Sequence, residues 1–97
     1  MTFKILVRKS VSNEAAKIFR YREVEKPGSG ERFIQVLSMA YREIRTNPFR
    51  FPIRKEEYRH YLIRKLKYRL VFRVIGDTIY VVQIRHMSQK PSKRYGP

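Results

Sequence analysis

The chain has 97 residues, enough for one modest hydrophobic core and too few for two domains. Its 23 Lys and Arg residues against 8 Asp and Glu residues give a formal net charge of +15, which favours nucleic acid or an acidic protein as partner. A hydrophobic content of 42% argues against disorder, and the lack of cysteine excludes disulfides, thiolate nucleophiles and thiolate zinc sites.

Hydrophobic spacing predicts a strand and two helices in the first half of the chain. The apolar run FKILV at residues 3–7 predicts a strand buried on both faces. Helical spacing then predicts helices over 11–24 and 31–45, separated by a PGSG break, the second ending before Asn47-Pro48. The first helix has three candidate N-caps, Ser10, Ser12 and Asn13. Two helices with so short a connection form an antiparallel hairpin with one apolar face.

After a Pro-punctuated loop at 47–57, three strands are predicted at about 59–65, 68–75 and 78–86. The expected fold is therefore α+β, with β-α-α-β-β-β order and an antiparallel meander after the helical hairpin. Residues 1–91 form this domain, and residues 92–97 form a basic, flexible tail. No run approaches the roughly 18 apolar residues that span a bilayer, and residues 1–8 are strand-like, so we expect no membrane contact and a bacterial cytoplasmic location.

The dipeptide Gly76-Asp77 has the form of a two-residue type II′ hairpin turn, which pairs residues whose numbers sum to about 153. One face then carries apolar side chains suited to packing under the helices: Tyr68, Leu70, Phe72 and Val74 opposite Arg85, Gln83, Val81 and Ile79. The other face carries Arg69, Val71 and Arg73 opposite Ile84, Val82 and Tyr80, with His86 across from Lys67. The arginines therefore gather on the side that the helices leave open.

The face that each residue of the preceding strand occupies depends on the turn at Leu66-Lys67. If Leu66-Lys67 is a two-residue turn, His60, Leu62 and Arg64 join the open face. A register slip by one residue would replace them with Arg59, Tyr61 and Lys65.

An open sheet face with arginines, a histidine and a tyrosine suits a phosphate backbone, because guanidinium groups bind phosphate bidentately and tyrosine rings stack on unpaired bases. The alternative is that these charges are merely solvated, as on any half-exposed sheet. The sign of the charge favours binding, because Asp77 is the only acidic residue between 58 and 97.

The stretch YRxxLIRKxxYRLVFRVxGDTIYVVxIRHxSxKP at residues 58–91, preceded by NPFRFP, a strand and two helices, resembles the RelE/ParE superfamily of type II toxin-antitoxin toxins. The resemblance covers residues 3–91 and implies a basic sheet face and an acidic cognate antitoxin in a hetero-oligomer. RelE-like members cut messenger RNA on the ribosome, whereas ParE-like members poison DNA gyrase. Arg69 occupies the position of a functional arginine in the RelE-like motif. The arrangement His86…Lys90-Pro91 is more typical of ParE-like tails, so neither subgroup fits completely.

The resemblance makes a ribosome-dependent mRNA endoribonuclease the first hypothesis for function, with a ParE-like gyrase poison and a degenerate antitoxin-binding or nucleic-acid-binding module as alternatives. In the first hypothesis Arg69 and Arg73 stabilise the transition-state charge, and His86 acts as acid or base. Weaker candidates for the remaining proton transfer are His60, Glu56, Glu57, Lys90 and Tyr95. Nucleic-acid or antitoxin binding is predicted for Arg59, Arg64, Tyr80, Lys90, Arg94 and Tyr95, with Lys93 also considered. No cofactor or metal is expected.

Overall fold

The computed structural model describes residues 2–90 and 93–96 of the chain. Its elements follow the order β1 (Lys4–Val7), α1 (Lys9–Glu25), α2 (Ser29–Thr46), the 3-10 helix η1 (Pro48–Arg50), β2 (Ile53–Lys55), β3 (Tyr58–Ile63), β4 (Tyr68–Ile75) and β5 (Thr78–His86). The predicted α+β order is confirmed. Elements η1 and β2 were not predicted, and both lie within the segment expected to be a loop.

The strands form one five-stranded sheet in the order β1-β5-β4-β3-β2. Strand β1 runs parallel to β5, and the other neighbours are antiparallel. The prediction that β1 is buried on both faces is wrong, because this strand lies at the edge and its residues alternate in burial. Leu6, directly beside Tyr80 on β5, is 54% exposed.

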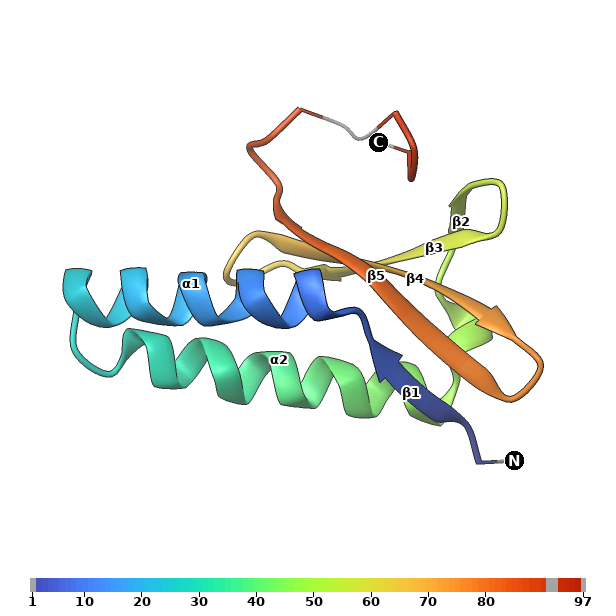
Figure 1. Ribbon diagram of the computed structural model, residues 1–97, viewed down its shortest axis with the longest axis horizontal. Helices are drawn as coiled ribbons and strands as arrows, with labels where there is room; N and C mark the ends of the chain where they lie inside the picture. The colour runs from blue at the N-terminus through green and yellow to red at the C-terminus, as the bar shows by residue number, and fades with distance from the viewer. Residues whose placement is uncertain (1, 91–92, 97) are drawn as a thin grey trace.

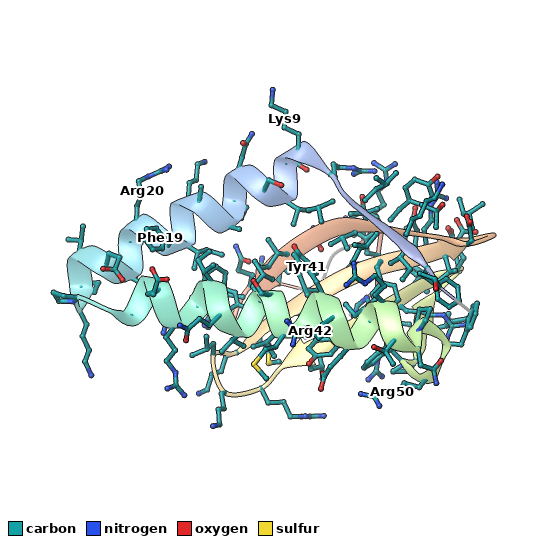
Figure 2. All side chains as sticks on the ribbon, turned by 90° about the horizontal axis from the view of Figure 1, so that it is seen from below. Lys9, Phe19, Arg20, Tyr41, Arg42 and Arg50 are labelled. Carbon is teal, nitrogen blue, oxygen red and sulfur yellow. The ribbon has the colours of Figure 1, made fainter. Side chains whose placement is uncertain are left out.

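Helices α1 and α2 cover one face of the sheet (Figures 1 and 2). The core between these layers consists of side chains recurring at helical spacing, with the inward residues of the strands beneath them: Val11, Ala15, Ile18, Phe33, Leu37, Ala40, Ile44, Leu70, Phe72, Ile79, Val81 and Ile84. Gly30 lets the helices approach closely, because a Cβ at this position would lie 2.5 Å from the Phe19 carbonyl oxygen.

The helix termini differ from the predicted capping. Helix α1 begins at Lys9, and none of the predicted caps Ser10, Ser12 and Asn13 precedes it. The start of α2 is instead stabilised by Glu23 of α1, whose carboxylate accepts hydrogen bonds from the Gly28 and Glu31 backbone N–H groups at 3.1 and 3.0 Å. These bonds lower the pKa of Glu23.

The β4–β5 hairpin contains the largest departure from the predicted register. Near the turn the pairing is as predicted, from Ile75 with Thr78 to Phe72 with Val81, and Gly76 has the positive φ of 61° that a type II′ turn requires. Beyond this point β5 carries one extra residue, Val82, in a β-bulge, so that Val71 pairs with Gln83 and Tyr68 with His86. Every later residue of β5 therefore changes face.

Strand β3 has the predicted face. His60 pairs with Val71 and Leu62 with Arg69, which places His60 and Leu62 on the open side. The turn that follows spans four residues, Arg64 to Lys67, rather than two, and Lys67 has a positive φ of 62°. The turn is longer than predicted by two residues, an even number, so each residue of β3 keeps its predicted face.

Candidate functional site

The sheet face opposite the helices, called here the open face, has a small apolar centre. Tyr58 of β3, Val71 of β4 and Val82 of β5 are buried there with Tyr95, and Tyr80 packs against them. Tyr95 reaches this centre because residues 93–96 lie on the opposite side of the sheet from α2 (Figure 1).

Four arginines surround this centre. Arg69 and Arg73 lie on the open side of β4, as predicted. Arg69 is directly opposite Arg85, which the predicted register had placed under the helices and which the bulge returns to the open face. Arg8, at the end of β1, donates a hydrogen bond to the Tyr95 hydroxyl at 3.1 Å. Like charges directly opposite each other destabilise a sheet, so the Arg69–Arg85 pair is better suited to binding an anionic group than to stabilising the fold.

The open face also contains buried polar atoms without a hydrogen-bond partner. Within the described part of the chain there are four such side-chain atoms: His60 Nδ1, Arg69 Nε, Arg73 Nε and Gln83 Oε1. All four residues belong to the open face. His60 of β3 and Gln83 of β5 are the two strand neighbours of Val71, which shares this face of β4 with Arg69 and Arg73. Buried polar groups are normally satisfied, so this concentration distinguishes the open face from the core.

Arg73 is held in place by an acidic neighbour. Its guanidinium donates to the Glu57 carboxylate at 2.7 Å and lies 5.9 Å from the centre of the Tyr58 ring. The hydrogen bond to Glu57 raises the pKa of Arg73. Glu57 thus neutralises part of the positive charge predicted for the site. Within residues 2–90 and 93–96, Arg69 and Arg85 are the arginines of β4 and β5 that form no ion pair with a carboxylate.

His60 lies beneath residues 93–96 and is 2% exposed. Its Nε2 is 2.8 Å from the Tyr95 carbonyl oxygen, so the neutral ring carries its proton on Nε2 and donates it there. Burial lowers the pKa of His60, the bond to Tyr95 raises it, and the positive charges of Arg69 and Arg54 lower it further.

Residues 93–96 have further contacts with the sheet. The Tyr95 and Tyr58 rings meet edge to face, with centroids 4.7 Å apart, and Lys55 donates to the Lys93 carbonyl oxygen. Gly96 has a φ of +93° and lies so close to β2 that a Cβ would come 3.0 Å from that of Lys55. The predicted mobility of the tail stays a prediction, and its residues Ser92 and Pro97 lie outside the described part of the chain.

His86 does not join the arginines. The prediction that it lies on the face of Arg69 and Arg73 is wrong, because the bulge pairs it with Tyr68 on the helix side. Its ring packs edge to face on Tyr68 at 5.1 Å, and its Nδ1 is 2.7 Å from the Ser88 hydroxyl. The catalytic roles assigned to Arg69, Arg73 and His86 stay predictions, but these three residues are not on one surface.

The predicted binding residues are also divided between surfaces. Tyr80 lies on the open face opposite Arg73, whereas the Arg59 guanidinium donates to the Phe49 and Phe51 carbonyl oxygens at 3.2 and 2.7 Å on the helix side. Arg64 is exposed in the β3–β4 turn. Lys90 and Arg94 are exposed; the Lys90 carbonyl accepts a hydrogen bond from Arg85, and the Arg94 guanidinium lies 5.6 Å from the Tyr95 ring centre.

Two tyrosines of the helix side are unsuited to proton transfer at neutral pH. Burial raises the pKa of Tyr41 to about 12, and burial together with the hydrogen bond to Glu43 raises that of Tyr61 to about 12. Glu56 is exposed in the turn between β2 and β3, beside Glu57. Among the described residues no group of three His, Asp or Glu side chains is placed to hold a metal ion.

Sequence reasoning missed Arg8, Tyr58 and Arg85. Tyr58 precedes the predicted start of its strand, and Arg85 was assigned to the wrong face. Arg8 follows the first strand directly, and the parallel pairing of β1 with β5, which brings it to Tyr95, has no local sequence signal.

The fold and this face define a small α+β protein with a cationic sheet surface that the helices leave open. Residues 5–91 match the family described as "ParE toxin of type II toxin-antitoxin system, parDE". The chain therefore belongs to the ParE toxin family. Among solved structures, it is similar to one titled "Chromosomal ParDE TA system from P. aeruginosa", with a TM-score of 0.79 and 13% sequence identity over 90% of this chain and 98% of the other. A search of curated proteins gave no match. No helix in the described ranges is long and apolar enough to cross a bilayer.

Proposed function

We propose that this chain is a toxin that arrests growth by binding its target without cleaving RNA, that DNA gyrase is this target, and that an acidic antitoxin neutralises it. The bulge at Val82 is the observation that carries the proposal. It leaves the open face strongly cationic but places His86, the strongest acid-base candidate of the sequence, on the other side of the sheet.

The remaining histidine is a poor substitute. RNA cleavage needs a group that takes the 2′-hydroxyl proton and another that protonates the leaving oxygen, both in contact with substrate. His60 is 2% exposed and its Nε2 is bonded to the Tyr95 carbonyl. The Tyr95 hydroxyl accepts a hydrogen bond from Arg8. Binding without bond cleavage requires none of these groups and agrees with a cationic surface around an apolar centre.

Membership of the ParE toxin family and the net charge of +15 support an acidic antitoxin as the second partner. An antitoxin lying on the open face would place carboxylates beside Arg69 and Arg85, the like-charged pair, and would relieve their repulsion. Charge reversal at both positions with unchanged antitoxin affinity would exclude this mode.

The experiment that tests the mechanism is expression of the chain alone in a bacterium, with pulse labelling of DNA and protein synthesis. DNA synthesis should stop first. Purified chain should then increase cleaved DNA in a gyrase assay and leave mRNA intact in a translating extract. Truncated mRNA with unaffected gyrase would replace the proposal with the endoribonuclease hypothesis.

Two matched variants locate the activity. Arg85→Glu reverses one charge on the open face, and Arg42→Glu makes the same change at an exposed position of α2. We expect Arg85→Glu to weaken growth arrest and Arg42→Glu to leave it unchanged. The reverse result would place the target-binding surface on the helices.

A further inference from the structure

Residues 93–96 cover the apolar centre of the open face. Tyr95 is 5% exposed, and it covers Tyr58, Val71 and Val82, the apolar side chains that the arginines surround. An apolar centre within a polar rim is the usual anatomy of a protein-binding surface. In this structure the chain itself fills that centre.

The contacts of the segment join it to distant parts of the chain. Tyr95 contributes one ring, one hydroxyl bonded to Arg8 and one carbonyl bonded to His60, and Lys93 contributes one carbonyl bonded to Lys55. Hydrogen bonds of this kind are each worth about 0.5–1.5 kcal/mol net, and Gly96 adds a β-bridge. Tyr95 is the large buried side chain of the segment and therefore its anchor.

Residues 93–96 carry positive charge, as does the face that they cover. Lys93 and Arg94 are exposed and positive, and the face beneath carries Arg8, Arg69 and Arg85. An acidic partner on the same surface would have opposite charge and would gain attraction where the segment has repulsion. Electrostatics therefore favours exchange of the segment for such a partner.

We propose that residues 93–96 are a displaceable cover of the open face, anchored by Tyr95, which must leave before a partner contacts Tyr58, Val71 and Val82. The role of the open face in target binding rests on the proposed function, whereas the cover itself does not. A partner's apparent affinity is then reduced in proportion to the fraction of molecules in which the cover is released.

Thiol labelling measures the release without any partner. The chain has no cysteine, so Val82→Cys introduces a single thiol at a site that is 6% exposed in contact with Tyr95. With the cover intact a maleimide should react slowly. Adding Tyr95→Ala should raise the rate roughly 10- to 100-fold, the factor that burial of one large side chain provides.

Three controls accompany this measurement. Tyr21→Ala removes an exposed tyrosine of α1 and should leave the rate unchanged, and Val24→Cys, 83% exposed, should react equally fast with or without Tyr95. Gln83→Cys probes the same place if Val82→Cys does not fold, because Gln83 lines a cavity of about 300 Å³ together with Tyr95. Urea unfolding confirms that each variant is folded.

The same proteins test displacement with purified DNA gyrase as the probe. Gyrase should protect the Val82→Cys thiol from labelling, and Tyr95→Ala should tighten gyrase binding by the factor found for labelling. An unchanged labelling rate after Tyr95→Ala at both thiol positions overturns the cover. Faster labelling with gyrase binding that is not tightened overturns displacement. Absence of gyrase binding in every variant rejects the proposed target, and labelling alone then decides the cover.

Discussion

On the helix-covered face, every side chain that β4 presents is apolar or aromatic, whereas on the open face the same strand alternates Arg69, Val71 and Arg73. In the described chain, the buried polar atoms without a hydrogen-bond partner all belong to the open side. The helical face is thus optimised for stability, and the open face retains unsatisfied polar groups that a monomer does not need. The two-residue period of a strand thus places a well-packed face and a face with unsatisfied polar groups back to back on one sheet.

The largest effect should follow from damage to the helix-covered face. Phe72 is fully buried there, so Phe72→Ala should lower the free energy of unfolding by about 3–5 kcal/mol. Urea unfolding followed by circular dichroism measures this loss. A cost below about 1 kcal/mol would contradict the assignment of the core to this face.

Arg69 should show the opposite behaviour. Arg69→Met removes one member of the Arg69–Arg85 pair, so we expect stability to stay the same or to rise by up to about 1 kcal/mol. Growth arrest, measured by colony formation after induction, should nevertheless be strongly reduced. Strong destabilisation by Arg69→Met would mean that this arginine is structural.

As the pH falls, protonation should weaken the cover of the open face before it destabilises the helices. The pKa of His60 is lowered from its ordinary value of 6.5, so the neutral form is favoured while Tyr95, Arg69 and Arg54 surround the ring. As the pH falls below 6.5, the unfolded chain and the uncovered state bind the proton first, and the cover is weakened. Thiol labelling at Val82→Cys, measured relative to the exposed Val24→Cys thiol, should therefore accelerate as the pH falls from 7.5 to 5.5.

His60→Gln provides the matched control, because it keeps a donor near the Nε2 position and cannot titrate. In the His60→Gln protein, the labelling rate of Val82→Cys should be independent of pH once it is divided by the rate of the exposed Val24→Cys thiol at the same pH. An identical acceleration in His60→Gln would assign the pH dependence to another group.

The smallest effect is expected at the helical hairpin, in a different pH range. The pKa of Glu23 is lowered from 4.5 by the backbone N–H groups of Gly28 and Glu31, so its contribution to stability is present above 4.5 and lost as the pH falls below that value. Glu23→Gln should reduce the melting temperature slightly at pH 7, with the difference disappearing toward pH 3. A difference that persists at pH 3 would show that the carboxylate charge is not the cause.

Much of the fold was predictable because its signals are local. Gly76-Asp77 fixed the turn, the 3.6-residue spacing around Phe33 and Ile44 identified α2, and Arg69 and Arg73 share a face because they lie four residues apart on one strand. The bulge was not predictable, since Val81-Val82 suits a strand in either register. It caused the errors at Gln83, Ile84, Arg85 and His86. Strand β2 escaped prediction because its three residues are exposed and show no alternation.

The candidate site was harder to predict because its contacts are non-local. Arg8 and Tyr95 are 87 residues apart in sequence, and neither lies in a motif that indicates their contact. The cationic character of the open face followed from composition and register. The covering of its centre did not, since a short basic tail has no pattern that distinguishes a bound segment from a solvated one.

The parallel pairing of β1 with β5 has a consequence for synthesis of the chain. Lys4 pairs with Thr78, so β1 can join the sheet only after β5 has been synthesised. Such long-range pairing forms late in folding. A nascent chain consequently lacks the finished cationic surface until β5 has left the ribosome, which delays the toxin's maturation until long after β1 has been made.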